Sequence, residues 1–457
     1  MKKRLLYAAV VACLGGYVFI GSQVFQASAS KDKADDAYEQ LELFSRVLER
    51  VRRDYVDGDK LTYEDLVHGA LKGMLNTLDP HSEFMEPVAF DELKEDTEGQ
   101  FSGVGMQVAQ RDDALVVVAP MEDTPAFEAG IMSGDRIVKI DGKSTEGMTV
   151  ADAVKLLRGQ PGSKVTITIA RSGNNDPRDF PLVREKIQVY TAKDINNRRE
   201  FPLDDSKVGY IRLTQFGEKT ADELEEALQK LERQGMKALV LDLRGNPGGL
   251  LDQAVAVCEK FVEKGKPIVS TKGRNAANDV ERRASGSGRK RVNEKLPMAI
   301  LVNGGSASAS EIVSGALQDL KRAVIVGEQS FGKGSVQSVM PLPDGSALRL
   351  TTAKYYTPSQ KVIHGQGITP NIVVPLSEDE EIAIQLARLP GGADNLELAL
   401  KAFPPDRQQK LRTLVQEHRD GQLERARDML KGISLYGHKG TDAAPEKAGV
   451  VPRPAVN

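Results

Sequence analysis

The chain has 457 residues, with 62 Lys and Arg against 65 Asp and Glu and a formal net charge of −3. This length predicts several domains, and the near balance of charge argues against a general nucleic-acid-binding protein. Tryptophan is absent and aromatic residues make up 5% of the chain, which argues against stacking platforms for bases or sugars.

The N-terminal 29 residues indicate export. Lys2, Lys3 and Arg4 precede an apolar run over residues 5–20, and Ala27-Ser28-Ala29 fits a small-x-small cleavage site. We therefore expect residues 1–29 to be a signal peptide and the remaining chain to be exported to the periplasm or cell envelope. An uncleaved inner-membrane anchor facing outward stays open, because the run approaches the roughly 18 residues that a spanning helix needs.

Residues 30–98 predict a helical arm. An amphipathic pattern runs over residues 34–57, and a second helix is expected over residues 63–75. These helices have no obvious core of their own, so they must pack on something else. A self-association arm and a brace on the main domain both stay open.

Residues 99–186 predict a β domain with one main helix. Strands are expected at residues 115–118, 136–140 and 165–170, and a short amphipathic helix is expected over residues 150–157. The stretch resembles a PDZ domain, a likeness carried by Phe101-Ser102-Gly103-Val104-Gly105 and by residues 129–137, 140–142 and 154–159.

In the PDZ family a glycine loop binds the terminal carboxylate of a peptide through backbone N–H groups, and the peptide adds a strand beside the groove. The resemblance implies this role for Phe101, Ser102, Gly103, Val104 and Gly105. The two glycines allow consecutive amides to face one anion. Arg158, beside the predicted helix, is a candidate switch that couples peptide binding to activity.

Residues 187–375 predict an α/β domain. Strands are expected at residues 208–213, 238–243, 268–271, 299–302, 323–326 and 347–351, with helices over residues 220–234 and 251–262. The near-continuous apolar strand at residues 238–243 is typical of a sheet that is covered on both faces. Cys258 lies on the packed side of its helix, so we expect a buried structural cysteine. The polar segment 273–295 predicts a solvated loop, with a basic patch as the alternative.

The C-terminal part predicts helices over residues 376–436, and a disordered tail over residues 437–457, which lack apolar periodicity. The fold class is therefore mixed α/β, in several domains. A helical arm, a β domain and an α/β core are followed by a helical C-terminal segment.

Several chemistries are disfavoured by motif spacing. No histidine has a partner histidine three or four positions away, so we expect no metal and no cofactor. The sequence Gly327-x4-Gly332-Lys333 lacks the magnesium ligand and the helix of a phosphate-binding loop. The serine-rich turn does not match Gly-x-Ser-x-Gly, although His364 stays open as a base that reaches a serine in space.

A serine and a lysine remain as the candidate catalytic pair. Ser306, Ser308 and Ser310 lie where a buried strand turns into a helix, and Lys333 lies between two glycines. A serine hydroxyl needs a base, and a lysine serves only if its pKa falls from about 10.4 toward roughly 7–8. Ser310 also stays open as the cap of the helix.

These two stretches resemble those of the C-terminal processing peptidases, or tail-specific proteases. The likeness is carried by residues 306–311, by Phe331-Gly332-Lys333-Gly334-Ser335-Val336-Gln337 and by residues 243–249. It implies that Ser308 is the nucleophile, Lys333 the general base and Gln337 the residue that orients the lysine. The oxyanion donors would be the Ala309 N–H and an N–H of Gly248 or Gly249.

The sequence therefore predicts an exported serine endopeptidase that captures apolar C-terminal tails on its PDZ domain and cleaves through an acyl-enzyme. The alternative is a PDZ-based envelope scaffold or adaptor with an inactive protease core. The expected partners are protein substrates with apolar C-terminal tails and further copies of this chain, joined through the N- and C-terminal helices. An activating adaptor protein is a further candidate partner.

Overall fold

The computed structural model describes residues 37–437 except 112–113, 122–123, 133, 172–173, 287–292, 294, 390–395, 398, 402 and 418. The chain divides into two compact units, residues 1–86 and residues 87–457. The predicted signal peptide and residues 438–457 of the predicted tail lie outside the described residues. Among the helices that are described, none is both long and apolar enough to cross a membrane.

The first unit contains the predicted helical arm. Residues 37–54 are helical, followed by η1 (Gly58–Lys60), α2 (Tyr63–Asn76) and β1 (Glu83–Met85). Thr62 and Asp65 start α2 with a reciprocal capping box. The first helix leaves large apolar side chains exposed, namely Tyr38, Leu41, Leu43, Phe44, Val47 and Val51.

The second unit opens with α3 (Pro87–Glu98), a helix that the sequence pattern did not predict. An antiparallel pair of strands follows, formed by β2 (Gln100–Gly103) and β9 (Glu185–Gln188). The sheet between them has the order β3-β4-β5-β7-β8, with β6 on β5. Its elements are β3 (Met106–Arg111), β4 (Ala114–Pro120), α4 (Pro125–Glu128), β5 (Arg136–Ile140), β6 (Lys143–Ser144), α5 (Val150–Leu157), β7 (Lys164–Arg171) and β8 (Asn174–Val183). The strand and the helix predicted at residues 136–140 and 150–157 are confirmed as β5 and α5.

The α/β core is built on a six-stranded sheet in the order β10-β11-β12-β15-β16-β19. The short β10 (Ala192–Lys193) is antiparallel to its neighbour. The parallel strands are β11 (Val208–Leu213), β12 (Ala238–Asp242), β15 (Met298–Val302), β16 (Val324–Gly327) and β19 (Ile372–Val373). Every residue of β12 and of β15 is buried, which confirms the expected covered sheet.

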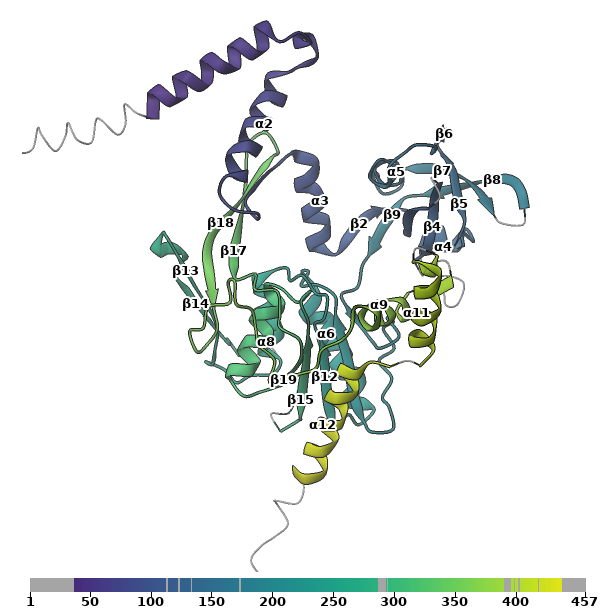
Figure 1. The fold of residues 1–457 in the computed structure, drawn as a ribbon, viewed down its shortest axis with the longest axis vertical. Helices are drawn as coiled ribbons and strands as arrows, with labels where there is room; N and C mark the ends of the chain where they lie inside the picture. The colour runs from purple at the N-terminus through teal and green to yellow at the C-terminus, as the bar shows by residue number, and fades with distance from the viewer. Residues whose placement is uncertain are drawn as a thin grey trace, which may run out of the picture. The chain divides into compact units, whose positions relative to one another are not determined.

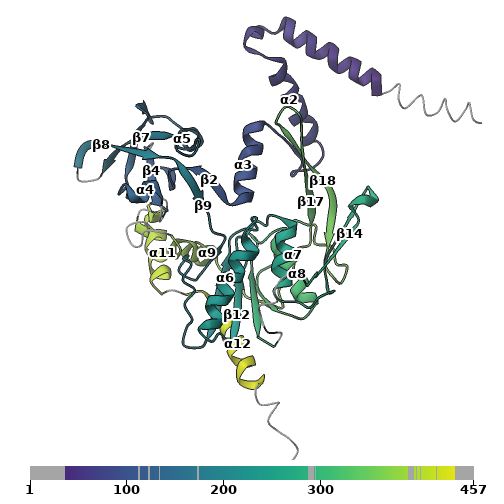
Figure 2. The same ribbon diagram turned by 180° about the vertical axis from the view of Figure 1, so that it is seen from behind.

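Helices cover both faces of this sheet (Figure 1). One face packs against α6 (Thr220–Arg233), α7 (Leu251–Glu259) and α8 (Ala309–Asp319), with Leu239 and Leu241 pointing toward them. The other face packs against α12 (Gly421–Gly437), where Val240 meets Leu423 and Leu430. Figure 2 shows α6, α7 and α8 together from behind. Cys258 of α7 is fully buried and free of a disulfide, as expected, and burial raises the pKa of its thiol.

A second, antiparallel sheet lies beside the core. Its strands β14 (Val280–Arg283), β13 (Pro267–Gly273), β18 (Ala347–Tyr356) and β17 (Ser335–Pro341) pair in this order. The prediction of a loop over residues 273–295 was therefore wrong in part, because η2 (Ala276–Asn278) and β14 form a hairpin with β13. Arg282 and Arg283 of the suggested basic patch pair with Asp252 and Glu281.

The C-terminal segment contains α9 (Glu378–Ala387), α11 (Pro405–Glu417) and α12. A small apolar cluster joins the first two helices through Ala383, Leu400 and Leu411. Helix α12 instead forms a layer of the core, because it covers the second face of the six-stranded sheet. All three helices begin within residues 376–436, where the sequence predicted helices.

Candidate active site

Ser308 lies at the turn between β15 and α8, where the sequence predicted an exposed side chain. It is half-buried, and its backbone has φ 52° and ψ −112°. A residue with a Cβ is strained in such a conformation by about 1–3 kcal/mol, and strain of this kind gathers at functional sites. The neighbouring hydrogen bonds must therefore hold this turn.

The other two serines of the turn have structural roles. The Ser306 hydroxyl donates to the Leu243 carbonyl at 2.8 Å and accepts from the Asn303 N–H. The Ser310 hydroxyl donates to the Asn246 carbonyl at 3.0 Å. Both serines are fully buried, so Ser308 is the only one of the three that a substrate can reach. The suggestion that Ser310 caps the helix was wrong, because α8 begins after Ser308 and Ser310 lies inside it.

A buried carboxylate joins the serine turn to the lysine loop. Glu311 accepts hydrogen bonds from the N–H of Ser308 at 2.8 Å and from the N–H of Lys333 at 2.9 Å. It also accepts from the Gly332 N–H and the Ser330 hydroxyl, each at 2.6 Å. Four donors on one carboxylate use its full acceptor capacity, so Glu311 fixes both loops with one side chain.

Burial and hydrogen bonding act on Glu311 in opposite directions. Glu311 is 0% exposed, and burial raises the pKa of its carboxyl above the ordinary value, while the donors of Ser330, Gly332 and Ser308 oppose the rise. Sequence reasoning placed Glu311 in the serine motif but gave it no role. The Ser-x-x-Glu spacing at the start of a helix, which is typical of a capping box, was the available signal.

Gln337 lies on β17, four residues after the lysine. Its amide Nε2 donates to the Thr351 hydroxyl at 2.9 Å and to the Ser335 hydroxyl at 3.2 Å. Its Oε1 is buried and accepts no hydrogen bond from any residue that the structure describes. The predicted partner, the Lys333 ammonium or amine, therefore does not donate to this oxygen here. A buried hydrogen-bond acceptor without a donor is uncommon, so we infer that Gln337 Oε1 accepts a hydrogen bond in another state of the site.

The glycine loop after β12 approaches the serine closely. Gly248 has φ +104°, and a Cβ built on it would lie 2.7 Å from the Cβ of Ser308 and 3.0 Å from the Ala309 nitrogen. The Gly248 N–H donates to the Asn246 side chain at 2.9 Å. The N–H groups of Gly249 and Ala309 donate to no described residue. Of the two glycines left open by the sequence, Gly249 is therefore the one with an N–H free to meet an oxyanion.

His364 does not act as the alternative base in this arrangement. The His364 side chain is exposed. The His364 backbone packs directly on the lysine loop, because a Cβ built on Gly334 would lie 2.1 Å from the His364 backbone nitrogen. No hydrogen bond joins His364 to Ser308 within the described residues. The loop that carries it is tied to the site through the Ile368 N–H, which donates to Ser330 at 2.7 Å.

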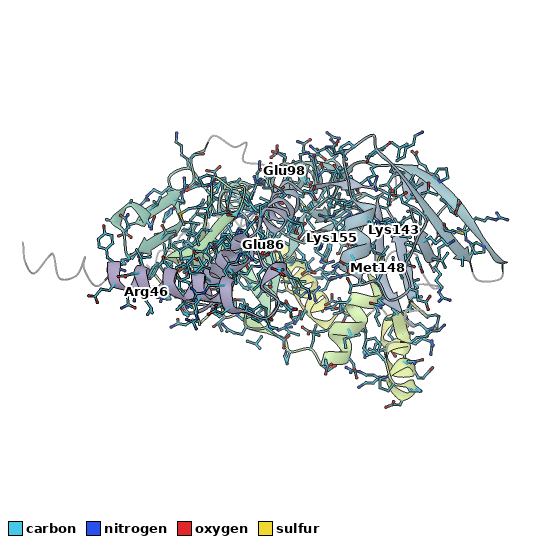
Figure 3. The ribbon with its side chains drawn as sticks, turned by 90° about the horizontal axis from the view of Figure 1, so that it is seen from above. Arg46, Glu86, Glu98, Lys143, Met148 and Lys155 are labelled. Atoms are coloured by element: carbon cyan, nitrogen blue, oxygen red, sulfur yellow. The ribbon has the colours of Figure 1, made fainter. Side chains whose placement is uncertain are left out.

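The predicted carboxylate-binding segment runs from β2 to the start of β3, the first strand of the PDZ sheet. Phe101, Ser102 and Gly103 belong to β2 and pair with β9. Val104 is buried in the core of the sheet. Gly105 has φ +74°, and a Cβ built on it would collide with the Thr124 side chain. The N–H groups of Val104 and Gly105 donate to no described residue. Side chains of this part are drawn in Figure 3, where Lys155 marks α5 and Lys143 marks β6.

Arg158, the candidate switch, follows the last residue of α5. Its guanidinium donates to the Glu95 carboxylate at 2.8 Å and lies 5.4 Å from the centre of the Phe101 ring. Glu95 belongs to α3, which leads into the PDZ domain. Arg158 therefore contacts both the helix and the strand that connect this domain to the rest of the unit.

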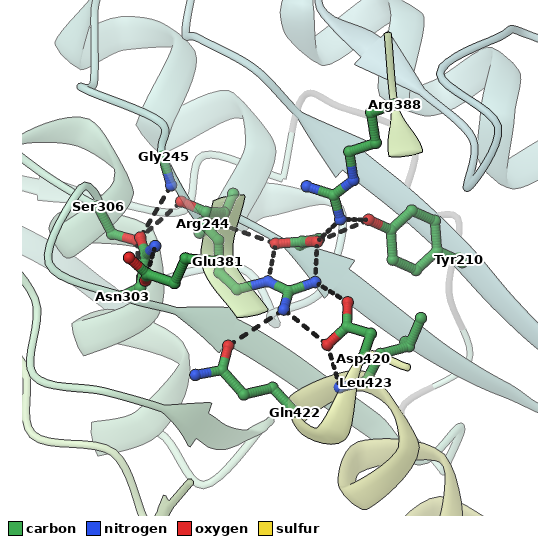
Figure 4. A network of polar contacts seen from close by, with 12 residues as sticks. Tyr210, Arg244, Gly245, Asn303, Ser306, Glu381, Arg388, Asp420, Gln422 and Leu423 are labelled. Atoms are coloured by element: carbon green, nitrogen blue, oxygen red, sulfur yellow. Dashed lines mark hydrogen bonds and ion pairs between the residues drawn. The ribbon is translucent and has the colours of Figure 1, made fainter. Parts of the chain in front are cut away.

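An ion-pair network holds the start of the glycine loop (Figure 4). Asp242 at the end of β12 accepts from Arg244 at 2.7 Å, from Arg388 at 3.0 Å and from the Tyr210 hydroxyl at 2.6 Å. Burial would raise the pKa of Asp242, but the two guanidinium groups outweigh it and hold that pKa well below its ordinary range. Sequence reasoning quoted Arg244 in a motif and missed this network.

No cluster of three or more His, Cys, Asp or Glu side chains that fits a metal ion occurs in the part of the chain that the structure describes. The site thus consists of Ser308, Lys333 and Glu311, the amides of Gly249 and Ala309, and the nearby Gln337.

Comparisons with known proteins show which families and proteins the chain is similar to. The sequence model of peptidase family S41 matches residues 207–374, and that of the PDZ domain matches residues 116–171. The carboxy-terminal-processing protease of Bartonella bacilliformis is 45% identical over 379 residues, which cover 81% of this chain and 83% of that protein. The carboxy-terminal processing protease CtpA of Bacillus subtilis is 35% identical over 385 residues, which cover 83% of this chain and 79% of that protein. Among solved structures, a photosystem II D1 C-terminal processing protease is 31% identical, with a TM-score of 0.41, over 77% of this chain and 97% of that one.

Proposed function

Because the chain belongs to peptidase family S41 and to its carboxy-terminal processing serine proteases, we propose that it cleaves protein substrates through an acyl-enzyme on Ser308. The observation that carries this proposal is the hydrogen bonding of Glu311 to the backbones of both Ser308 and Lys333. A nucleophile and a base on separate loops can cooperate only if their loops are fixed together.

In this mechanism the neutral Lys333 amine takes the proton of the Ser308 hydroxyl as the oxygen attacks the scissile carbonyl. The carbonyl oxygen becomes an oxyanion, which receives hydrogen bonds from the Gly249 and Ala309 N–H groups. Lys333 then gives its proton to the leaving amine. In the second half of the reaction the Lys333 amine deprotonates a water molecule that attacks the acyl carbonyl, and Lys333 returns this proton to the Ser308 oxygen as the ester bond breaks. The open Oε1 of Gln337 supports its predicted role, because it can accept a hydrogen bond from the Lys333 amine during these steps.

The PDZ domain would supply the substrate to this site. Strand β3 is the last strand on one side of its sheet, so its outer edge is open to an added peptide strand. The unpartnered amides of Val104 and Gly105 lie directly before β3, where the terminal carboxylate of that peptide would bind. These features support capture of C-terminal tails, with apolar tails proposed from the family resemblance.

Export and self-association belong to the same proposal. The basic and apolar N-terminal residues support an exported protein of the periplasm or cell envelope. The exposed apolar side chains of the first helix, with Leu41, Phe44 and Val47 at spacings of three, support a homo-oligomer. Helices of the C-terminal segment would add contacts, and an adaptor protein would be a further partner.

A direct test uses the purified chain with an unfolded substrate that ends in apolar residues. The same substrate with acidic last residues and a Ser308→Ala variant of the protease serve as controls. We expect cleavage of the first substrate, slower cleavage of the second and no cleavage by the variant. Equal cleavage of both substrates would contradict tail capture, and proteolysis by Ser308→Ala would contradict the nucleophile.

A further inference from the structure

We propose that Asp420, on the C-terminal side of the chain, is a positioning residue for the protease reaction: it holds Arg244 and thereby the glycine loop that carries the Gly249 oxyanion donor. This inference rests on the proposed function, because it concerns the oxyanion site of that reaction. Asp420 touches neither the serine nor the lysine. It lies 176 residues after Arg244 and directly before α12.

The contact between Asp420 and Arg244 is a two-point ion pair. One guanidinium nitrogen donates to Asp420 Oδ1 at 2.9 Å and the other donates to Asp420 Oδ2 at 2.7 Å. The Arg244 side chain is 5% exposed and that of Asp420 is 14% exposed. Paired hydrogen bonds of this kind fix the plane of the guanidinium as well as its position, and burial protects them from screening.

Asp420 completes the coordination of the arginine (Figure 4). The opposite edge of the guanidinium donates to Asp242 at 3.0 and 2.7 Å, and Gln422 accepts a further hydrogen bond at 3.1 Å. The side chain of Gln422 in turn donates to the Val374 carbonyl at 2.8 Å. The guanidinium is thus held between the end of β12 and the start of α12.

Asp420 also affects the balance of buried charge around Arg244, beyond the ion pair that it forms. Asp242 and Asp420 supply two negative charges to Arg244 and Arg388. A third arginine, Arg212, lies close enough for burial and the charges of Arg388 and Arg244 to lower its pKa, so positive charge is already in excess. Removing Asp420 would leave Arg388 and Arg244 to share Asp242 alone in a buried setting. An excess of buried positive charge is costly, so Arg244, with Asp242 as its remaining anionic partner, would be expected to shift toward solvent and carry its backbone along.

Arg244 is followed directly by the glycine loop, residues 245–249, which includes the proposed oxyanion donor. The Gly245 N–H donates to Asn303 at 2.9 Å, and the Asn246 carbonyl accepts from the Ala307 N–H at 3.0 Å. Asn246 also orients Gly248, which packs on Ser308. A shift at Arg244 would therefore be passed within a few residues to Gly249, whose amide is the proposed oxyanion donor.

The rest of the C-terminal segment holds the same region at two other points. Arg388, at the end of α9, contacts Asp242 at 3.0 Å. Glu381 of α9 accepts from the Asn303 amide at 3.2 Å, and Asn303 also accepts from the N–H groups of Gly245 and Gly305. Three contacts from one segment onto the loops around Ser308 indicate a built support for the site.

The experiment compares Asp420→Asn with Arg427→Gln. Asn keeps the shape of the side chain and removes its charge. Arg427 lies on the same helix α12 and pairs with Asp204 at 3.5 Å, so its replacement weakens a different contact of that helix. Steady-state cleavage of the apolar-tailed substrate, the rate of labelling by a fluorophosphonate and the Tm are measured for each.

We expect Asp420→Asn to lower kcat by about tenfold or more with KM changed by less than about twofold, because a donor displaced by ~1 Å costs up to ~100-fold in rate. Labelling should slow by a similar factor, since the phosphonyl adduct needs the same oxyanion donors. Arg427→Gln should keep kcat, and Asp420→Glu should restore part of it. If Asp420→Asn does not fold, Gln422→Leu takes its place, with a smaller loss expected.

Several results would overturn the inference. One is a kcat of Asp420→Asn equal to that of Arg427→Gln, and another is a loss that raises KM alone. A third is a loss of activity that parallels the unfolded fraction without slower labelling of the folded protein. Failure of the proposed function has a different signature, since then the wild-type chain does not cleave the substrate or Ser308→Ala cleaves it equally well.

Discussion

Glu311 and Lys333 lie 22 residues apart in the chain, and the buried carboxylate of the first accepts a 2.9 Å hydrogen bond from the backbone N–H of the second. The same carboxylate accepts from the Ser308 N–H. One buried side chain therefore ties the loop of Ser308 to the loop of Lys333.

Replacing Glu311 by Gln should impair catalysis more than substrate binding. The amide nitrogen of Gln replaces one carboxylate oxygen and presents donors to the backbone N–H of either Gly332 or Lys333, which now donate to different oxygens, so at least one hydrogen bond is lost. We expect kcat to fall by about 10- to 100-fold, as for other small displacements of catalytic groups. Steady-state kinetics with an apolar-tailed substrate measure kcat and KM. Glu328→Gln is the control, because the Glu328 side chain makes none of the described hydrogen bonds that hold the loop of Lys333. Unchanged kcat in the Glu311 variant would contradict the positioning role.

The raised pKa of Glu311 also predicts how stability depends on pH. The folded protein holds the proton of this carboxyl more tightly than the unfolded chain, so protonation favours the folded state. The contribution is present below the ordinary glutamate pKa and is lost as pH rises through the raised value. The free energy of unfolding, taken relative to Glu311→Gln, should fall across that window by about 1.4 kcal/mol for each unit by which the pKa is raised. Denaturant unfolding between acidic and neutral pH measures it, and a relative stability that rises with pH would reverse the assigned direction.

Gly248→Ala should disable the site through steric contact. The new Cβ would lie 2.7 Å from the Ser308 Cβ and 2.8 Å from the Ala307 carbonyl oxygen, so the glycine loop must move away from the serine. We expect a loss of about 100-fold or more in kcat, which is the size of effect seen when an oxyanion donor is removed. Gly245→Ala is the matched control, because Gly245 also has a positive φ but open space where the Cβ would be. Equal activity of the two variants would show that the close approach is unimportant.

Lys333→Arg should abolish proteolysis even though it keeps the positive charge. A guanidinium does not lose its proton in a protein, so it cannot accept the proton of Ser308. We expect Lys333→Arg and Lys333→Ala to be equally inactive, and wild-type kcat to rise with pH as the lysine becomes neutral. A pH–rate profile of the three proteins tests this, and activity of Lys333→Arg near the wild-type level would exclude the lysine as the base.

Arg158→Ala should uncouple tail recognition from cleavage. Its ion pair with Glu95 and its position over Phe101 join the PDZ domain to the adjoining helix. We expect the ratio of cleavage rates for apolar-tailed and acidic-tailed substrates to fall toward one, with the fluorophosphonate reactivity of Ser308 retained. Lys155→Ala, on the exposed side of the same PDZ helix, is the control. A variant that keeps the full preference for the apolar tail would rule out a coupling role for Arg158.

The sequence alone predicted the strands and helices whose apolar residues follow a regular pattern. The apolar runs predicted β11, β12 and β15 closely, because a strand covered on both faces must be apolar throughout. The helices α2, α5 and α6 were also predicted close to their observed bounds. The hairpin of β13 and β14 was missed, since a polar, arginine-rich strand at the edge of a sheet has the composition of a loop.

For the candidate site, the sequence alone predicted the residues that belong to a single short motif. Burial then separated Ser308 from Ser306 and Ser310, a distinction that three closely spaced serines cannot show. The contact between Arg244 and Asp420 was beyond reach, because nothing in the sequence near either residue points to a partner 176 positions away. The choice of Gly249 over Gly248 depended on one side chain, that of Asn246, which occupies the Gly248 N–H.

The place of α12 in the fold has a consequence for the timing of synthesis. Its Leu423, Ala426 and Leu430 cover one face of the catalytic sheet, and Asp420 contributes to the support of the glycine loop. A ribosome makes this segment after every other element of the described core, and a nascent chain cannot pack a helix that it does not yet contain. Partial chains would thus leave an apolar sheet face bare and the oxyanion loop unsupported. Proteolytic competence would therefore be gained only after α12 has been made and packed on the sheet.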